Sequence, residues 1–379
     1  MLRTQVINQL IDYFEINPVV AILGPRQCGK TTAVHQYLET LKDFPKQNYF
    51  DLENSRDVAR LKDPLLALSP LSGLIVIDEI QFAPELFPTL RVLVDNKTLN
   101  QRFLILGSAS TQLLKQSSET LAGRISYIEL TPFGYPEVGD LEKVWVRGGF
   151  PKSYLAKSDG HSQQWRHSFI KTFLEKDIPK LGINIPSENL RRFWMMLAHR
   201  HGQILNSSDI GNSLQLSHNT IRHYTDILIG TFMIRQLQPW FENITKRQVR
   251  SPKIYFRDSG IFHTLININS YADLQLHPLL GHSWECFALE EIIRHHRADP
   301  EDCYFWSTQQ GAELDLLLMQ HNKRIGFEIK YSSTPKLTRS MQIACEDLKL
   351  DECRVIYPGD IDFPLSKKVN VFGLKNYLK

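Results

Sequence analysis

Cysteine is scarce in this chain, and long apolar runs are absent from it. Its 379 residues include only 5 cysteines, an odd number with no CxxC pair. Neither a disulfide framework nor a paired-cysteine zinc site is therefore expected, and the composition fits a reducing, cytoplasmic location. No apolar run reaches the roughly 18 residues of a membrane-spanning helix, so we expect no membrane partner.

The chain also has no large excess of charge of either sign, with 44 Lys and Arg against 41 Asp and Glu. The formal net charge is +3, which is too small to indicate a nucleic-acid partner by itself. Low-complexity tracts and internal repeats are lacking, and 42% hydrophobic and 22% charged residues are ordinary for a folded protein. The N-terminal MLRTQVINQLIDYFEINP reads as an amphipathic helix containing acids, unlike a signal peptide. A chain of this length is expected to form two or three domains.

Residues 1–140 alternate short β-rich runs with helical stretches. LIVID and RFLILGS are typical of buried strands, and PELFPTLRVLVDN between them has helical spacing. This alternation predicts an α/β domain with a parallel sheet and helices on both faces.

The segment GPRQCGKT, residues 24–31, fits the G-x-x-x-x-G-K-[ST] pattern of a phosphate-binding loop. The apolar PVVAIL precedes it and TTAVHQYLETL follows, so the order strand, loop, helix is expected. Glycines allow backbone N–H groups to converge on an anion, and the positive end of the helix would point at it. Lys30 would contact the β- and γ-phosphates of ATP, and Thr31 would bind Mg²⁺. The expected nucleotide-binding residues of this loop are Gly24, Pro25, Arg26, Gln27, Cys28, Gly29, Lys30, Thr31 and Thr32.

Two acids follow the next predicted strand, in LIVIDEIQ. In a parallel sheet, residues at the carboxyl ends of the strands bind the ligand. Asp78 would therefore bind Mg²⁺ and Glu79 would activate the attacking water. Ser108, at the end of RFLILGS, would touch the γ-phosphate or the water. Arg124 follows a glycine at a helix end, where it would either stabilise transition-state charge in a neighbouring subunit or form a surface ion pair.

The middle of the chain, residues 141–265, is predicted to be a helical lid followed by a winged helix-turn-helix. The run NSSDIGNSLQLSHNTIRHYTDILIG has two helix starts around a short corner. Its second helix would present Asn219 and Arg222 to duplex DNA, and the following polar loop would add Lys246, Arg247 and Arg250. The alternative is that this module is a packing platform between domains.

Residues 266–379 are predicted to form a small α/β domain. An acid on one strand, Asp315, is followed by Glu328 and Lys330 on the next, which is the PD-(D/E)xK nuclease pattern. The two carboxylates would hold Mg²⁺ while the lysine steadies a water, and Glu285 on the preceding helix would add a third acid. The alternative is a salt bridge between Glu328 and Lys330 in a fold that no longer cleaves.

Seven motifs in order carry a family resemblance: GPRQCGKTT, LIVIDEIQ, GSAS, LAGR, RGGFP, SPKIYFRDSG and GAELDLLL…FEIK. Together they resemble the prokaryotic AAA-type ATPases with a C-terminal winged-helix and nuclease-like region. The resemblance implies an AAA-plus P-loop domain at 1–140, the lid and winged helix at 141–265 and a nuclease-like domain at 266–379. It implies ATP and Mg²⁺ as cofactors. Sensors of that family often use Asn where this chain has Ser108.

The expected function is thus ATP hydrolysis with Mg²⁺, coupled to DNA or protein binding. A nucleotide-gated binding switch with little turnover and an ATP-regulated metal-dependent nuclease are the alternatives. Duplex DNA and a second copy of the chain are the expected macromolecular partners.

Overall fold

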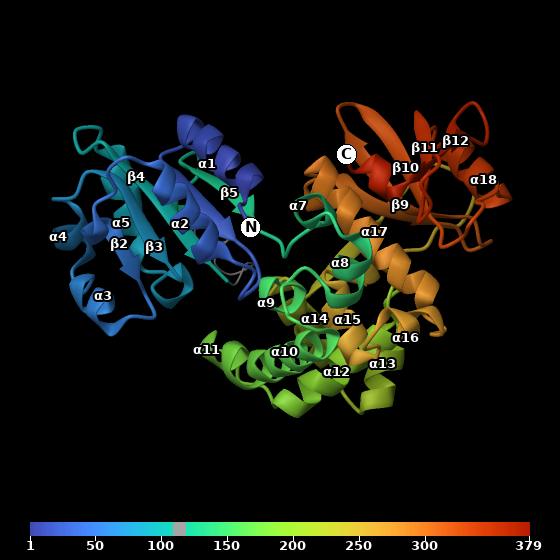
Figure 1. The fold of residues 1–379 in the computed structure, drawn as a ribbon, viewed down its shortest axis with the longest axis horizontal. Helices are drawn as coiled ribbons and strands as arrows, with labels where there is room; N and C mark the ends of the chain where they lie inside the picture. The colour runs from blue at the N-terminus through green and yellow to red at the C-terminus, as the bar shows by residue number, and fades with distance from the viewer. Residues whose placement is uncertain (109–118) are drawn as a thin grey trace. The chain divides into compact units, whose positions relative to one another are not determined.

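The computed structural model describes residues 1–108 and 119–379, and the chain folds into two compact units (Figure 1). The first unit comprises Met1–Pro132, Asp177–Asn184 and Gly230–Phe232. The second comprises Phe133–Lys176, Ile185–Ile229 and Met233–Lys379. In the described ranges, no helix has the length and apolar character needed to cross a membrane.

The first unit is built on a five-stranded sheet whose strands are all parallel, in the order β2-β3-β4-β1-β5. The strands are β1 (Val19–Leu23), β2 (Tyr49–Asp51), β3 (Gly73–Asp78), β4 (Gln101–Gly107) and β5 (Ile125–Glu129). Its helices within residues 1–108 are α1 (Thr4–Ile16), α2 (Lys30–Thr40), α3 (Ser55–Arg60), α4 (Pro64–Leu68) and α5 (Leu86–Asp95), and α11 (Ile178–Lys180) also belongs to this unit. The predicted parallel α/β domain is confirmed.

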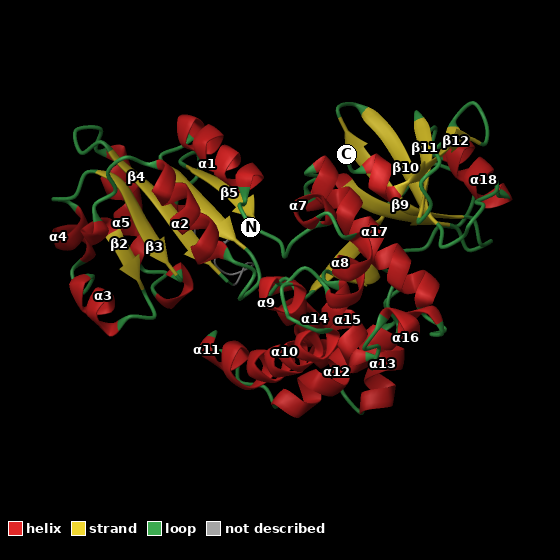
Figure 2. Cartoon of the chain, in the orientation of Figure 1, coloured by secondary structure: helices red, strands yellow, loops and turns green. Residues whose placement is uncertain are grey.

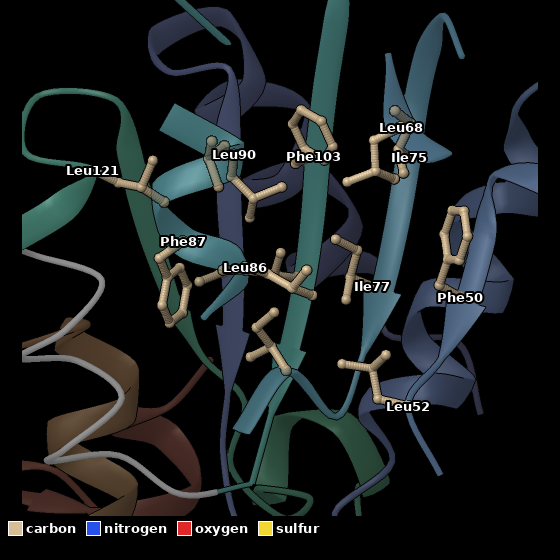
Figure 3. Close-up of a cluster of buried hydrophobic side chains, with 14 of the residues drawn as sticks. Phe50, Leu52, Leu68, Ile75, Ile77, Leu86, Phe87, Leu90, Phe103 and Leu121 are labelled. Atoms are coloured by element: carbon tan, nitrogen blue, oxygen red, sulfur yellow. The ribbon is translucent and has the colours of Figure 1, made fainter. Parts of the chain in front are cut away.

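Every residue of β1 is buried, because helices pack on both faces of the sheet. Figure 3 shows one face, where Ile75, Ile77 and Phe103 of the strands meet α5 in a single apolar cluster. The period of two along β1 directs Val20 and Ile22 to the other face, where α1 contacts both α2 and β1. This packing fixes the end of β1, and therefore the loop that follows it.

The second unit joins a helical region to a mixed sheet (Figure 2). Its helices before the sheet are α7 (Tyr135–Val138), α8 (Leu141–Arg147), α9 (Pro151–Tyr154), α10 (Asp159–Thr172), α12 (Ser187–His199), α13 (Ser207–Leu214) and α14 (His218–Gly230, which ends at the boundary of the first unit). Its later helices are α15 (Ser259–Leu265), α16 (Tyr271–Gln275), α17 (Leu280–His296), α18 (Arg339–Asp347) and α19 (Leu374–Tyr377).

Eight strands form the sheet, in the order β12-β13-β11-β10-β9-β8-β6-β7. They are β6 (Ile234–Pro239), β7 (Lys253–Phe256), β8 (Cys303–Ser307), β9 (Glu313–Gln320), β10 (Lys323–Ile329), β11 (Glu352–Tyr357), β12 (Phe363–Pro364) and β13 (Val369–Gly373). The β6–β7 pair is antiparallel, as a wing would be. However, β6 also pairs in parallel with β8, so these two strands belong to the same sheet as the C-terminal strands. The sequence did not predict this pairing, because nothing local to β6 specifies a partner about 65 residues away.

Two of the glycine motifs meet inside the second unit, RGGFP at residues 147–151 and RDSG at 257–260. Asp258 accepts hydrogen bonds from the N–H groups of Gly149 at 2.8 Å and Ile261 at 2.9 Å. A Cβ built on Gly260 would lie 2.2 Å from the carbonyl oxygen of Arg147. Because the atom that this Cβ would meet belongs to the backbone of Arg147, rotating a side chain cannot relieve the clash.

Gly260→Ala should therefore lower the free energy of unfolding by at least about 2 kcal/mol, because one backbone segment must move away from the other. Gly281→Ala is the matched control, since α17 leaves open space around that position. Alanine there should stabilise the helix by about 0.5–1 kcal/mol. Urea unfolding of both variants measures the difference, and equal midpoints would contradict the close approach.

Candidate functional site

The loop between β1 and α2 has the backbone of an anion cradle. Gly24 lies so close to the β5 side of the sheet that a Cβ there would be 2.1 Å from the carbonyl oxygen of Leu130. Gln27 and Gly29 have left-handed backbones, with φ of 63° and 101°. Turns of this hand direct successive N–H groups into a concavity, and α2 begins at Lys30 immediately after it.

The side chain of Lys30 folds back over this loop. It is buried, and its Nζ atom donates to the carbonyl oxygens of Gly24 and Pro25, each at 3.0 Å. These are neutral acceptors. A phosphate oxygen carries charge and would form a stronger bond with the same ammonium group.

The buried side chains of Arg3 and Cys28 attach the loop to the chain that follows β5. The Arg3 guanidinium donates to the carbonyl oxygens of Cys28 at 3.0 Å and Thr131 at 3.1 Å. Cys28 is buried with its Sγ atom 3.3 Å from the carbonyl oxygen of Leu130, and burial raises the pKa of its thiol. Cys28 therefore packs as a small apolar side chain.

Asp78, at the end of β3, is brought directly beside the loop. Its Oδ2 atom accepts from the hydroxyl of Thr31 and from the hydroxyl of Tyr49, both at 2.9 Å. Burial and the nearby Asp78 carboxylate raise the pKa of Tyr49, so its hydroxyl stays a donor. A buried carboxylate beside a threonine hydroxyl suits Mg²⁺, which would take its remaining ligands from phosphate and water. Within the described ranges, no three His, Cys, Asp or Glu side chains form a group that could hold a metal.

Glu79, the next residue, belongs to a small polar cluster. It has a left-handed backbone, with φ of 57°. Its Oε2 atom contacts the amide of Gln81 and lies 3.3 Å from the hydroxyl of Ser108, at the end of β4. Gln81 also donates to the Ser108 oxygen at 2.9 Å. The structure thus brings Glu79 and Ser108 together, and it adds Gln81, which the sequence analysis missed.

Arg124 lies at the opposite edge of the sheet from the loop. Its carbonyl accepts from Val19, the first residue of β1, whereas the loop follows the last. Val19 and the last residue of β1, Leu23, are four residue steps apart, roughly 13 Å along the strand. The half-buried Arg124 side chain is paired with Asp95 at 2.6 and 3.0 Å. It does not join the nucleotide residues of its own chain, so the predicted catalytic role would require a second copy.

The predicted DNA-contacting residues are divided in the structure. Asn219 and Arg222 are exposed on α14, and Arg247 and Arg250 are exposed on the loop between β6 and β7. Lys246, in contrast, forms an ion pair with Asp347 of α18 at 2.6 Å. Arg222 also lines a cleft of about 710 Å³ between α13, α14 and β6. The other polar side chains of this cleft are Asn206, Ser207, Ser208, His218, Thr225, Asp226, Gln236, Gln238 and Ser251.

The predicted C-terminal residues do lie together, on β9, on α17, and on β10 and the residue that follows it. Lys330 Nζ is 2.6 Å from Glu328 Oε1, and Asp315 accepts from the N–H of Ile329 at 2.8 Å. Burial, and then the Glu328 charge, raise the pKa of Asp315. Burial likewise raises the pKa of Glu328, whose buried Oε2 atom has no hydrogen-bond partner in the part of the chain described.

Strand β7 contributes two further side chains to this C-terminal cluster. The buried Lys253 pairs with Glu313, and the attraction of nearby acids raises its pKa despite burial. Tyr255 donates to Glu285 Oε1 at 2.6 Å. Sequence reasoning missed both residues in this role, although a lysine opening the apolar run KIYF was a usable signal. Each lysine neutralises part of the acid cluster.

Comparison with known proteins matches three families along the chain. A family described as AAA domain matches residues 16–139. A domain of unknown function (DUF8612) matches 138–272, and another (DUF4143) matches 280–377. An uncharacterised protein of Mycobacterium tuberculosis is 48% identical over 356 residues, which is 93% of this chain and 79% of the relative. An uncharacterised protein of Haemophilus influenzae is 24% identical over 265 residues, covering 61% of this chain and 65% of that protein.

Two solved structures resemble the chain at low sequence identity. The Walker-type ATPase PABY2304 of Pyrococcus abyssi aligns with 70% of this chain and 95% of its own, at 15% identity and a TM-score of 0.48. RuvB of Thermotoga maritima aligns with 66% of this chain and 89% of its own, at 16% identity and a TM-score of 0.29.

Proposed function

The chain belongs to the same family as its mycobacterial relative, with an AAA-type P-loop domain at its N-terminal end, and we propose that it hydrolyses ATP with Mg²⁺. One observation carries the proposal. The loop lysine, the Thr31–Asp78 pair and the Glu79–Ser108 cluster all lie where β1, β3 and β4 end. Ligands of open α/β sheets bind at this edge.

Each of these side chains has a task in phosphoryl transfer. The loop N–H groups and Lys30 bind and orient the phosphates. Mg²⁺ held near Thr31 and Asp78 would neutralise charge on the phosphate oxygens. Glu79 orients the attacking water and accepts its proton, while Ser108 and Gln81 hold the Glu79 carboxylate in place.

We expect Lys30→Ala to weaken ATP binding by about 100-fold, because the phosphates lose a charged donor worth about 3 kcal/mol. Glu79→Gln should bind ATP within about twofold of wild type and lose at least about 100-fold in turnover. Glu85→Gln, an exposed change six residues further on, is the control. Nucleotide titration and phosphate release measure both effects. Wild-type turnover by Glu79→Gln would disprove its assigned role.

Nucleotide state would be coupled to DNA binding through the second unit. Support comes from Asn219, Arg222, Arg247 and Arg250, whose exposed side chains can all donate hydrogen bonds. Arginines on a loop suit contacts with the phosphate backbone, which need no base-specific geometry. Arg222 on α14 is better placed to read bases, because the second helix of such a module enters the major groove.

Replacing both Arg247 and Arg250 with Ala should weaken duplex binding similarly for all sequences and lower its salt slope by about one unit per lost contact. Arg222→Ala should alter sequence preference instead. Lys246→Ala is the control, because that ammonium group is already paired with Asp347. Fluorescence anisotropy over a salt series measures the slopes. Binding to a protein partner rather than DNA becomes the better reading if wild type shows no salt-dependent DNA affinity with or without ATP.

The C-terminal acids would have a structural rather than a catalytic role. Lys330 and Lys253 supply two positive charges to a cluster of four acids, Glu285, Glu313, Asp315 and Glu328. An ion pair of 2.6 Å occupies the Glu328 oxygen that faces Lys330. We therefore favour the interpretation in which the lysines neutralise this nuclease-like site.

Asp315→Ala should then lower the melting temperature, because the Ile329 N–H loses its acceptor and Lys330 loses a nearby charge. Mn²⁺ should change the melting temperatures of wild type and Asp315→Ala equally in the absence of nucleotide. Asp78→Asn is the control for metal binding at the phosphate loop. Metal-dependent cleavage of DNA by wild type that disappears in Asp315→Ala would show an active nuclease instead.

A further inference from the structure

Arg26 belongs to the phosphate loop, yet its guanidinium binds two carboxylates. Its Nη1 atom contacts Asp177, and its Nη2 atom lies 2.9 Å from Glu53 Oε1. Glu53 follows β2, so it lies near the same edge of the sheet as the loop. Asp177 begins the segment Asp177–Asn184, which belongs to the first unit although the residues on either side belong to the second. This arrangement ties a distant stretch of sequence to the loop through one cation.

The charged form of the buried Asp177 carboxylate depends on the Arg26 guanidinium for its stabilisation. Its side chain is only 7% exposed, and its Oδ2 atom has no hydrogen-bond partner in the part of the chain that the structure describes. Burial raises the pKa of its carboxyl group, and Arg26 opposes the rise. A buried carboxylate with half its acceptors unused is costly without a positive partner.

The helix geometry also changes at Asp177. A π-helical turn, Phe173–Asp177, ends there, and the short α11 (Ile178–Lys180) begins at the next residue. Such turns are rare and are found frequently at functional sites. The segment is therefore irregular at the residue that Arg26 holds.

A triphosphate in the loop would compete for Arg26. The guanidinium forms bidentate bonds with phosphate that are stronger than neutral hydrogen bonds. A phosphate would also repel Glu53 and Asp177, because like charges lie close together there. Lys180 of the same segment also pairs with Glu53, Nζ to Oε1 at 3.1 Å, and repulsion of Glu53 by the phosphate would weaken this second contact as well.

We propose that Arg26 exchanges its two carboxylates for the terminal phosphate of ATP and thereby releases the Asp177–Asn184 segment. The inference rests on the proposed ATPase function. ADP lacks this phosphate, so Arg26 would stay bound to Asp177 when ADP is in the loop. Arg26 is therefore the residue that distinguishes ATP from ADP, and the segment is released only with ATP. Asp177 is a positioning residue in this scheme, because it acts only through Arg26.

The test combines nucleotide titration with hydrogen exchange of residues 177–184, using a non-hydrolysable ATP analogue and ADP on the full chain. In wild type, the analogue should bind at least about tenfold more tightly than ADP and should speed exchange in the segment, whereas ADP should not. Arg26→Gln should lose the preference, keep its ADP affinity within about twofold, and exchange rapidly without nucleotide. Asp177→Asn should exchange rapidly and bind the analogue a few-fold more tightly. Arg56→Ala, an exposed change on α3, should behave as wild type.

Retention of the wild-type preference by Arg26→Gln, or exchange that the analogue does not change in wild type, overturns the inference while the ATPase proposal stands. Failure of wild type to bind either nucleotide overturns both. Arg26→Lys guards against a folding defect in Arg26→Gln, because it retains the charge but not the fork geometry. It should keep slow exchange and lose most of the preference for the analogue.

Discussion

The hydrogen bond between Thr31 and Asp78 is the interaction on which the candidate nucleotide site depends. It joins the first turn of α2 to the end of β3, two elements that are 47 residues apart in sequence. Only a parallel sheet brings these ends to one edge, because β4 lies between β1 and β3 and all three run in the same direction. The sheet order thus converts separate sequence motifs into one site.

Both units contain buried charged side chains, but the groups that these side chains contact differ. Around the phosphate loop of the first unit, Asp78 accepts from three neutral donors and Lys30 lies against neutral carbonyls, whereas Arg26 is paired with Asp177 and Glu53. Lys30 can therefore exchange its carbonyl acceptors for phosphate, and Asp78 can exchange its neutral donors for a cation. In the second unit, Glu328 and Glu313 are paired directly with lysines. Both lysines are already paired inside this acid cluster, which favours a structural role for it.

The parts of the site that the sequence predicts are those with local signals. The glycine spacing around Lys30 indicated the loop, and apolar runs ending in polar residues indicated Asp78, Glu79 and Ser108. The strands and helices that carry these residues are present in the structure, and their functional roles remain predictions. The C-terminal motif likewise indicated residues that do lie together.

The missed residues act across long sequence separations. Tyr49 reaches Asp78, Asp177 reaches Arg26, and Lys253 reaches Glu313 over 29, 151 and 60 residues. No periodicity or short motif specifies such pairs, because they follow from how strands are ordered in the sheets. The pairing of β6 with β8 was missed for the same reason.

The most direct test of the account is the Mg²⁺ dependence of ATP affinity in wild type and Asp78→Asn. Thr31 and Asp78 are proposed to share a cation with the phosphates, so Mg²⁺ should tighten ATP binding to wild type at least about tenfold relative to EDTA. Asp78→Asn should lose most of that gain while still binding ATP in EDTA. An ATP affinity that is equal with and without Mg²⁺, or the absence of ATP binding to wild type, would contradict the central claim.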